Sequence, residues 1–204
     1  MEASFYSHFP NLLVTLISLT FFLNLSSAAR PISSYPSTEF IKTSCSSTTY
    51  PKLCISSLST HANLIQTSPK LIAHAALNVT LATAKVTSLM MVNLSKSQGM
   101  KPKEVEAMQD CLEELSDTVD ELRKSIGEMG QINNKGSDFG MLMSDIQTWV
   151  SAALTDENTC SDGFGGKAMN GNVKTTLRLK IMNIAHLTSN ALALINRYAS
   201  IHHG

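Results

Sequence analysis

The sequence predicts an all-α protein: an antiparallel up-and-down four-helix bundle, preceded by a short N-terminal helical hairpin and held by two disulfides. Three observations support this prediction. Glycine and proline stand at plausible boundaries of long segments. One of these segments repeats its apolar residues in an unbroken heptad pattern, which is typical of a helix in a bundle. No alternating apolar run of useful length indicates a strand.

The first 29 residues predict a secretory signal peptide. No Asp, Glu, Lys or Arg lies between Glu2 and Arg30, and an apolar core at residues 11–25 precedes four small residues. This core of about 14 apolar residues is short for a membrane span, which needs roughly 20. Because the first ten residues lack Lys and Arg, an uncleaved anchor remains the alternative. We expect cleavage after Ala28 or Ala29, a flexible segment at residues 30–39 and a folded domain at residues 40–200.

All four cysteines lie in the chain that remains after cleavage: Cys45, Cys54, Cys111 and Cys160. An even number of cysteines in an oxidising compartment favours two disulfides, and spacing alone leaves three connectivities open. A zinc site is the alternative, but zinc-ligand pairs usually stand two to four residues apart. Eight residues separate the nearest pair here, so we expect disulfides and no metal.

Two short segments, at residues 37–45 and 50–58, fit helices that their cysteines clip together. Ser68-Pro69 then predicts the start of the first long helix, because a capping hydroxyl is followed by proline at the first helical position. This helix is expected to end at Gly99. Its inward residues recur at steps of four and three: Ile72, Ala76, Val79, Thr83, Val86 and Met90.

Lys101-Pro102 opens the second long helix, which carries the heptad pattern: Val105, Met108, Leu112, Leu115, Val119, Leu122, Ile126 and Met129. The third helix is expected at residues 141–160, with Leu142, Ile146, Trp149 and Ala153 inward. The fourth is expected at residues 173–200, with Val173, Leu177, Ile184, Thr188, Ala191, Ile195 and Tyr198 on one face. Short connections make the four helices antiparallel.

Charge is balanced overall but unevenly distributed. Once Glu2 leaves with the signal peptide, 15 acidic and 16 basic residues remain, and this balance points to no nucleic-acid partner. Residues 101–129 contain nine acids and four bases, whereas no acid follows Asp162. The acidic segment is either a solvated helix face or a docking face for a basic partner.

The sequence contains no set of nucleophile, base and oxyanion donors, so we expect no catalytic residues and no cofactor. The stretch "GFGGK" at residues 163–167 lacks the Ser/Thr and the preceding strand of a phosphate-binding loop, and a helix-ending loop is the better interpretation. Asn78 and Asn93 begin glycosylation sequons that remain in the secreted chain.

Three acids in the second long helix, Glu113, Asp117 and Asp120, are spaced four and three residues apart. Their carboxylates therefore share one helix face, distinct from the heptad seam. This acidic stripe either docks against a partner or only stabilises the helix, as an Asp120–Lys124 pair would.

Two stretches carry a family resemblance: "WVSAALTDENTCSDGF" at residues 149–164 and "AHLTSNALALIN" at residues 185–196. They resemble the plant invertase and pectin methylesterase inhibitor family, and the cysteine spacing is similar too. The resemblance covers residues 40–198 and implies disulfides Cys45–Cys54 and Cys111–Cys160. It also extends to the inhibitory region fused to some pectin methylesterases, but with no catalytic domain before Gly204 we expect a free-standing inhibitor.

Members of this family inhibit either enzyme. Invertase inhibitors carry a Gly-Asp-Pro-Lys-Phe-like segment before the third bundle helix, whereas this chain reads Gly136-Ser137-Asp138-Phe139. The resemblance therefore implies an inhibitor of pectin methylesterase, with invertase as the alternative target. A helical lipid or small-ligand carrier is a further alternative, but the dense seam of the second helix argues against the cavity that it would need.

The resemblance also implies where the enzyme binds. Counted from Cys111, the partner-facing acids fall on Glu113, Asp117 and Asp120; counted from Cys160, Thr159 and Asp162 join them. A hydrogen bond from Thr159 to another helix is the alternative role for that residue. We expect a secreted, apoplastic or cell-wall protein, monomeric when free and not membrane-bound after cleavage. It would cover the active-site cleft of pectin methylesterase in a reversible 1:1 complex and so limit pectin demethylesterification.

Overall fold

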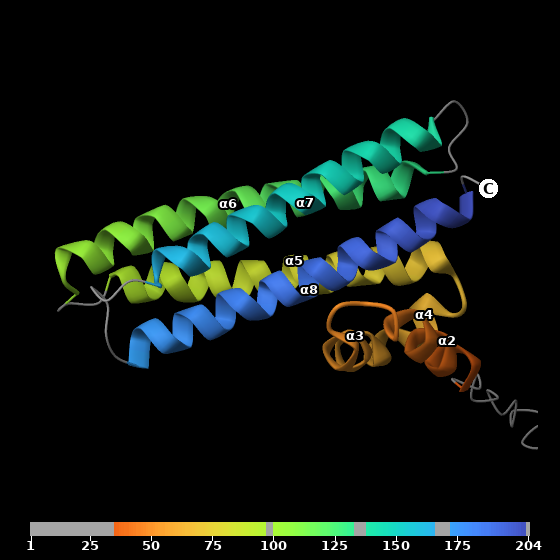
Figure 1. The fold of residues 1–204 in the computed structure, drawn as a ribbon, viewed down its shortest axis with the longest axis horizontal. Helices are drawn as coiled ribbons and strands as arrows, with labels where there is room; N and C mark the ends of the chain where they lie inside the picture. The colour runs from red at the N-terminus through yellow and green to blue at the C-terminus, as the bar shows by residue number, and fades with distance from the viewer. Residues whose placement is uncertain (1–34, 97–99, 133–137, 166–171, 203–204) are drawn as a thin grey trace, which may run out of the picture. The chain divides into compact units, whose positions relative to one another are not determined.

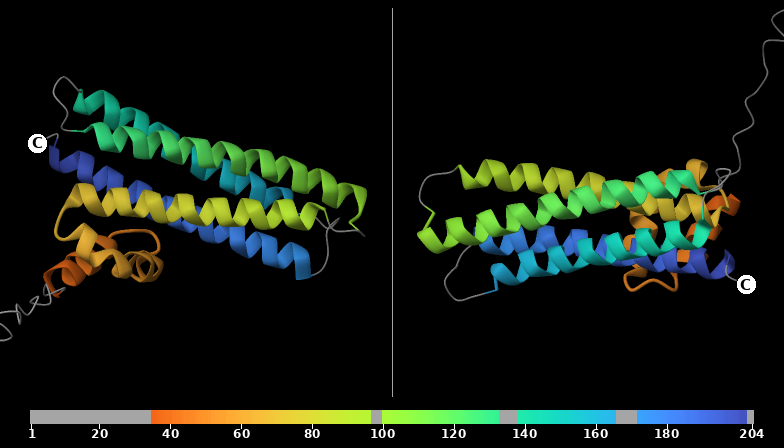
Figure 2. Two further views of the ribbon diagram at one scale, coloured as in Figure 1. Left: turned by 180° about the vertical axis from the view of Figure 1, so that it is seen from behind. Right: turned by 90° about the horizontal axis from the view of Figure 1, so that it is seen from above.

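Four long antiparallel helices form a bundle in the computed structural model, which describes residues 35–96, 100–132, 138–165 and 172–202 (Figure 1). These helices are α5 (Pro69–Ser95), α6 (Pro102–Gln131), α7 (Phe139–Gly163) and α8 (Asn172–His202). Each packs against its neighbours, and α8 closes the bundle against α5 (Figure 2). The predicted fold class is confirmed. The expected signal peptide lies outside the described residues.

Short helices precede the bundle, as predicted. Helix α2 (Tyr35–Cys45) is joined to α3 (Pro51–Leu58) by the Cys45–Cys54 disulfide, and both cysteines are buried. A turn of 3-10 helix, η1 (Ser59–His61), and a single helical turn, α4 (Ala62–Ile65), then lead into α5. The turn at α4 was not predicted from the sequence, since four residues are too few to show a helical period.

Helix α8 anchors the loop between α2 and α3. The Tyr50 backbone N–H donates to Asn190 Oδ1 at 2.9 Å, and Asn190 Nδ2 donates to the Tyr50 carbonyl at 3.0 Å. The Tyr50 ring also stacks on His186, with 3.7 Å between centroids. Because Asn190 is buried, both ends of its amide need these partners. The "HLTSN" part of the sequence thus holds the N-terminal helices on the bundle.

The helix starts follow the capping signals of the sequence. Ser68 Oγ accepts from the Leu71 N–H, as predicted for the start of α5. Glu104 accepts from the Lys101 N–H at the start of α6. Asp138 caps α7 by accepting from the Met141 N–H at 3.1 Å. Asp138 thus has a structural role, whereas the preceding Gly136 and Ser137 lie outside the described residues.

The predicted inward face of α5 is displaced by one residue over its second half, where Val79 and Met90 are only partly buried against the core. Ile72 and Ala76 are buried, but Val86 is 67% exposed. From Val79 onward the buried residue is the one after each predicted position: Thr80, Ala84, Thr87 and Met91. Leu71 and Leu89 are also exposed, so α5 is apolar on its outer face as well as its inner one. When a helix is apolar on both sides, the pattern of apolar residues does not predict which side faces the core.

The other seams agree with the structure where it describes them. In α6, Met108, Leu115, Val119, Leu122 and Met129 are buried. Gly127 lies inside α6 rather than at a boundary. In α7, Val150 is fully buried, whereas Trp149, which was predicted to face inward, is only half-buried. The Lys124 ammonium lies over the Trp149 ring, 5.9 Å from its centroid. The face predicted for α8 is buried from Leu177 to Tyr198.

By length and composition, one described helix, α5, is apolar enough to cross a membrane. The core helix of a soluble bundle meets the same test, and α5 supplies core residues from Ile72 to Met91. We therefore interpret α5 as a core helix whose outer face is also apolar.

Candidate functional site

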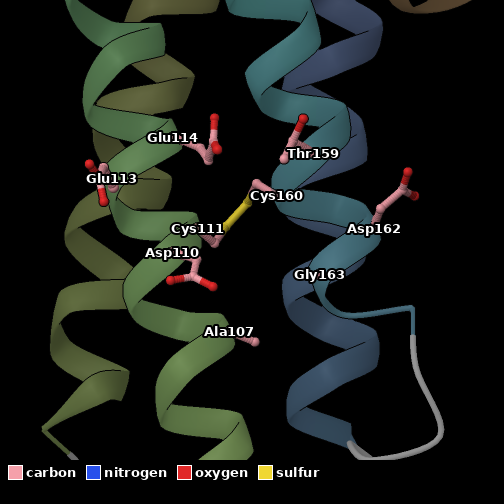
Figure 3. Close-up of a pocket in the computed structure, with 9 residues that line it drawn as sticks. All are labelled: Ala107, Asp110, Cys111, Glu113, Glu114, Thr159, Cys160, Asp162 and Gly163. Carbon is pink, nitrogen blue, oxygen red and sulfur yellow. A yellow bond between two sulfur atoms is a disulfide. The ribbon is translucent and has the colours of Figure 1, made fainter.

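A surface groove lies between α6 and α7 at the Cys111–Cys160 disulfide (Figure 3). The two cysteines are buried, and the bond crosses from one helix to the other. The groove has a volume of about 630 Å³. Its lining comes from α6 and α7 alone: Ala107, Asp110, Cys111, Glu113, Glu114, Thr159, Cys160, Asp162 and Gly163.

Helical spacing places the polar side chains beside the bond. Asp110 and Glu114 stand four residues apart on α6 and so lie on one side of that helix, around Cys111. Thr159 and Asp162 flank Cys160 on α7. The disulfide fixes the distance between the two helices, and therefore the distance between these two sets of side chains. The groove is thus a braced surface rather than a mobile loop.

The groove is strongly acidic. Four carboxylates line it, from Asp110, Glu113, Glu114 and Asp162, and no Lys or Arg is among its lining residues. A concave surface with charges of one sign concentrates the field and attracts groups of opposite charge. The arrangement therefore suits a basic group or a hydrogen-bond donor from a partner.

The structure brings three of the five predicted partner-binding residues together in this groove: Glu113, Thr159 and Asp162. Asp117 and Asp120 are exposed on α6 but are not among the lining residues. Asp120 pairs with Arg123 at 2.6 Å, so the predicted pairing with Lys124 is wrong. Asp110 and Glu114 also line the groove. Asp110 stands one residue before Cys111 and Glu114 three residues after it, so counting from this cysteine locates both acids.

Thr159 is exposed, and its hydroxyl donates to the Thr155 carbonyl within the same helix at 3.0 Å. The alternative role, a hydrogen bond to another helix, is therefore wrong. The Thr159 side chain remains accessible beside the groove.

Next to the groove, two acids face each other across α6 and α7. The pKa of Glu121 is raised to about 7, mainly by burial and to a smaller extent by the neighbouring Asp156 carboxylate. Burial likewise raises the pKa of Asp156, and both burial and Asp156 raise the pKa of Glu114. Two carboxyl groups that share a site favour the protonated form of one of them. The sequence showed these acids but not their pairing, because Glu121 and Asp156 stand 35 positions apart.

A further acid is buried beneath this surface. Glu157 is fully buried on α7, where the Thr188 hydroxyl donates to its Oε1 at 2.7 Å. No described residue gives its Oε2 a hydrogen-bond partner. Burial therefore raises the pKa of Glu157 to about 8. The sequence signal was the position of Glu157 in line with Val150 and Ala153, on the inner face of α7.

The glycine-rich stretch after Cys160 ends α7. Phe164 is fully buried, and the Gly165 N–H donates to the Asp162 carbonyl at 2.7 Å. A Cβ on Gly165 would lie 2.9 Å from that carbonyl oxygen, so the turn requires glycine. The described part of the stretch thus behaves as the helix-ending loop that we predicted; Lys167 lies outside the described residues.

Comparison with known proteins gives concordant matches. The sequence profile described as "Plant invertase/pectin methylesterase inhibitor" matches residues 39–194. Pectinesterase inhibitor 11 of Arabidopsis thaliana is 46% identical over 194 residues, which cover 94% of this chain and 96% of that protein. The 21 kDa protein of Daucus carota is 46% identical over 171 residues, 83% of this chain and 89% of that protein.

The fold agrees as well. A crystal structure of a mutant form of a pectin methylesterase inhibitor from Arabidopsis superposes with a TM-score of 0.62. The match covers 76% of this chain and 95% of that chain at 20% identity, so it bears on the fold alone. The profile match across most of the chain, together with nearly full-length relatives, establishes that the chain belongs to the plant invertase/pectin methylesterase inhibitor family.

Proposed function

We propose that this protein is a secreted, non-catalytic inhibitor of pectin methylesterase. It binds the enzyme reversibly in a 1:1 complex and covers the active-site cleft, so that pectin keeps its methyl esters. The observation that carries the proposal is the 46% identity to pectinesterase inhibitor 11 along almost the whole of both chains. The family also includes invertase inhibitors by its description, and the names of the relatives favour pectin methylesterase over invertase.

The acidic groove at the Cys111–Cys160 bond supports the proposal as the surface that meets the enzyme. Its carboxylates and the Thr159 side chain present hydrogen-bond acceptors on two helices that a disulfide joins. A surface that is rigid before binding loses little conformational freedom when it binds. A rigid surface can therefore inhibit tightly through a modest contact area, and no covalent step is needed.

The exposed acids Asp117 and Asp120 extend the proposed surface along α6 beyond the groove. Asp120 must share its carboxylate with Arg123, which lies 2.6 Å away. We therefore expect the groove residues Glu113 and Asp162 to contribute more to affinity than Asp120.

Two electrostatic modes of binding lead to different outcomes. If ionised carboxylates meet basic groups of the enzyme, the complex weakens as salt rises. If a carboxyl such as Glu114, whose pKa burial already raises, shares a proton with an acid of the enzyme, the complex tightens as pH falls. Dissociation constants at pH 5 and pH 7, each at two salt concentrations, separate the modes.

The test of the proposed function is an inhibition assay with both candidate enzymes. The mature chain, purified from the medium of a secreting plant-cell culture, is titrated into pectin methylesterase with methylated pectin and into invertase with sucrose. We expect loss of pectin methylesterase activity that is complete near equimolar inhibitor, with invertase unaffected. Inhibition of invertase alone would overturn the proposal.

The same preparation tests stoichiometry and secretion. Light scattering during gel filtration should give the mass of a monomer for the free protein and the summed mass of one inhibitor and one enzyme for the mixture. N-terminal sequencing should begin at Ala29 or Arg30. Protein that is missing from the medium and is found in the membrane fraction with residue 1 retained would show an uncleaved anchor in place of the proposed signal peptide.

A further inference from the structure

The outer face of α5 is apolar and exposed. Val86 is 67% exposed and Leu89 is 65% exposed, and the helix contains no Asp or Glu from Pro69 to Ser95. About a third of its most apolar stretch is buried in the bundle. Most surface helices place charged residues outward. Val86 and Leu89 therefore form an exposed apolar patch on the outer face of α5.

Both retained sequons lie on this same face. Asn78 and Asn93 are exposed, as are Ala82 and Lys85 between them. At about 100° per residue, these residues together with Val86 and Leu89 fall within an arc of roughly 100°. We call this set the α5 stripe: Asn78, Ala82, Lys85, Val86, Leu89 and Asn93. The two asparagines lie at its ends, about 22 Å apart along the helix, and Leu89 is one turn from Asn93.

Asn78 and Asn93 are both exposed in the folded protein, and hydrogen bonds define the surroundings of Asn78. Asn78 Nδ2 donates to the His74 carbonyl at 2.8 Å and lies 3.2 Å from His74 Nδ1, so a glycan on Asn78 would replace one of these two contacts and leave one N–H for the other. Thr80, the hydroxyl residue of the first sequon, is fully buried and bonded to the Ala76 carbonyl. Since the transferase must reach Asn78 and Thr80 together, modification must precede folding of the bundle, during entry into the secretory pathway.

We propose that N-linked glycans on Asn78 and Asn93 cover the apolar α5 stripe. In the transfer, the asparagine amide nitrogen bonds to the anomeric carbon of a lipid-diphosphate-linked oligosaccharide. The bond from that carbon to the diphosphate breaks, the amide loses one proton, and the lipid diphosphate leaves with the electron pair. Two hydrated oligosaccharides, one from each end, then shield Val86 and Leu89 from contact with other molecules.

The glycans leave the candidate site open. Helix α5 packs against α6 and α8 and lies diagonal to α7 (Figures 1 and 2). The acidic groove faces outward between α6 and α7, with its lining on those two helices (Figure 3). Glycans on the outer face of α5 therefore point away from the surface that we propose for the enzyme. This inference rests on the proposed secretion and not on enzyme inhibition.

The first experiment is intact mass spectrometry of the full chain secreted by plant cells, before and after enzymatic removal of N-glycans. We expect two oligosaccharide increments on the wild type, one on Asn78→Gln, one on Asn93→Gln and none on the double variant. Ser95→Ala should remove the Asn93 glycan while keeping that asparagine, and Ser95→Thr should restore it. Asn63→Gln, an exposed asparagine outside any sequon, is the matched control and should keep both increments.

The second experiment tests the covering role. The glycan-free double variant should bind an apolar fluorescent dye more strongly and self-associate at lower concentration than the glycosylated wild type. Adding Val86→Thr and Leu89→Gln to the double variant should reverse both effects. Inhibition of pectin methylesterase should stay equal in all of these proteins. The inhibition assay therefore tests the proposed function, and dye binding and self-association test the glycan shield.

Three outcomes would overturn the inference. The first is a secreted wild type with the mass of the unmodified chain. The second is a glycan-free variant with unchanged dye binding and self-association. The third is equally tight binding of the glycosylated protein and the double variant to vesicles of neutral phospholipid, because the stripe would then contact a membrane in spite of the glycans.

Discussion

Thr188 of α8 donates a hydrogen bond to the buried Glu157 of α7 across 2.7 Å in the interior of the bundle. This pair joins two helices through a carboxyl group whose pKa burial raises to about 8. The folded protein therefore holds the Glu157 proton through the weakly acidic and neutral range, where an unfolded chain would release it near 4.5.

Glu157 should make stability depend on pH. Because its pKa is higher in the folded state, its contribution is most favourable below pH 4.5, falls as pH rises, and becomes constant above about 8. Glu157→Gln keeps an acceptor for Thr188 but cannot ionise. We expect the variant to lie within about 1 kcal/mol of the wild type at pH 5 and to gain roughly 4 kcal/mol of stability relative to it between pH 5 and pH 8.5. Urea unfolding at both pH values measures this. A wild-type stability that rises between pH 5 and pH 8.5 would contradict this role of Glu157.

The pair of acids between α6 and α7 should act in the same direction. Burial and Asp156 together raise the pKa of Glu121 to about 7. Glu121→Gln removes the like-charge contact that develops above that pH. We expect a higher melting temperature than wild type at pH 8 and an equal one at pH 5. Glu106→Gln, an exposed acid on the same helix, is the control and should change neither. An equal rise at both pH values would mean that packing, rather than charge, explains the effect.

The Cys111–Cys160 disulfide should stabilise both the bundle and the groove. Replacing both cysteines by serine opens a loop of 49 residues. We expect a loss of about 2–5 kcal/mol in unfolding free energy and weaker inhibition, because the two lining helices are no longer joined. Thermal unfolding and inhibition of pectin methylesterase are the measurements. Retention of both the melting temperature and full inhibition would refute the bracing role.

The amide of Asn190 should hold the N-terminal helices on the bundle. Asn190→Ala leaves the half-buried Tyr50 N–H without its partner, whereas the Tyr50 carbonyl still accepts from the Cys54 N–H at 3.0 Å. We expect a loss of roughly 1–3 kcal/mol, from one polar group left without a partner. Cleavage by proteases at residues 46–50 should become faster. Asn196→Ala removes an exposed hydrogen bond, which Gln147 Nε2 donates to Asn196 Oδ1, and should change stability little. Equal cleavage rates in the two variants would contradict this anchor.

Much of the fold could be predicted because α6 is amphipathic. Its exposed acids and lysines leave only one face for the core, so Met108, Leu115 and Leu122 were placed correctly. Helix α5 has no acids and only two lysines, Lys70 and Lys85, so its outer Val86 was mistaken for a core residue. The orientation of α5 follows from its packing against α6 and α8, which is a tertiary effect that local periodicity does not contain.

The candidate site was predictable where it lies close to a cysteine in sequence. Glu113, Thr159 and Asp162 stand within two residues of Cys111 or Cys160 and share the groove. Interactions between helices were not predictable in this way. Asp156 meets Glu121, and Glu157 meets Thr188, only because α7 packs between α6 and α8. Asp120 pairs with Arg123, while Lys124 lies over the Trp149 ring of the neighbouring helix, a contact that the sequence spacing of α6 does not contain.

The most direct test of the central claim, that the acidic groove binds pectin methylesterase, compares inhibition constants at pH 5 for two variants of equal charge. Glu113→Gln with Asp162→Asn changes the groove, whereas Glu39→Gln with Glu106→Gln removes two carboxylates outside it. We predict that the groove variant weakens inhibition at least about tenfold, or ~1.4 kcal/mol, at an unchanged melting temperature. The control should stay within about twofold of wild type, since exposed charges contribute little. Equal inhibition constants for wild type and the groove variant would contradict the account.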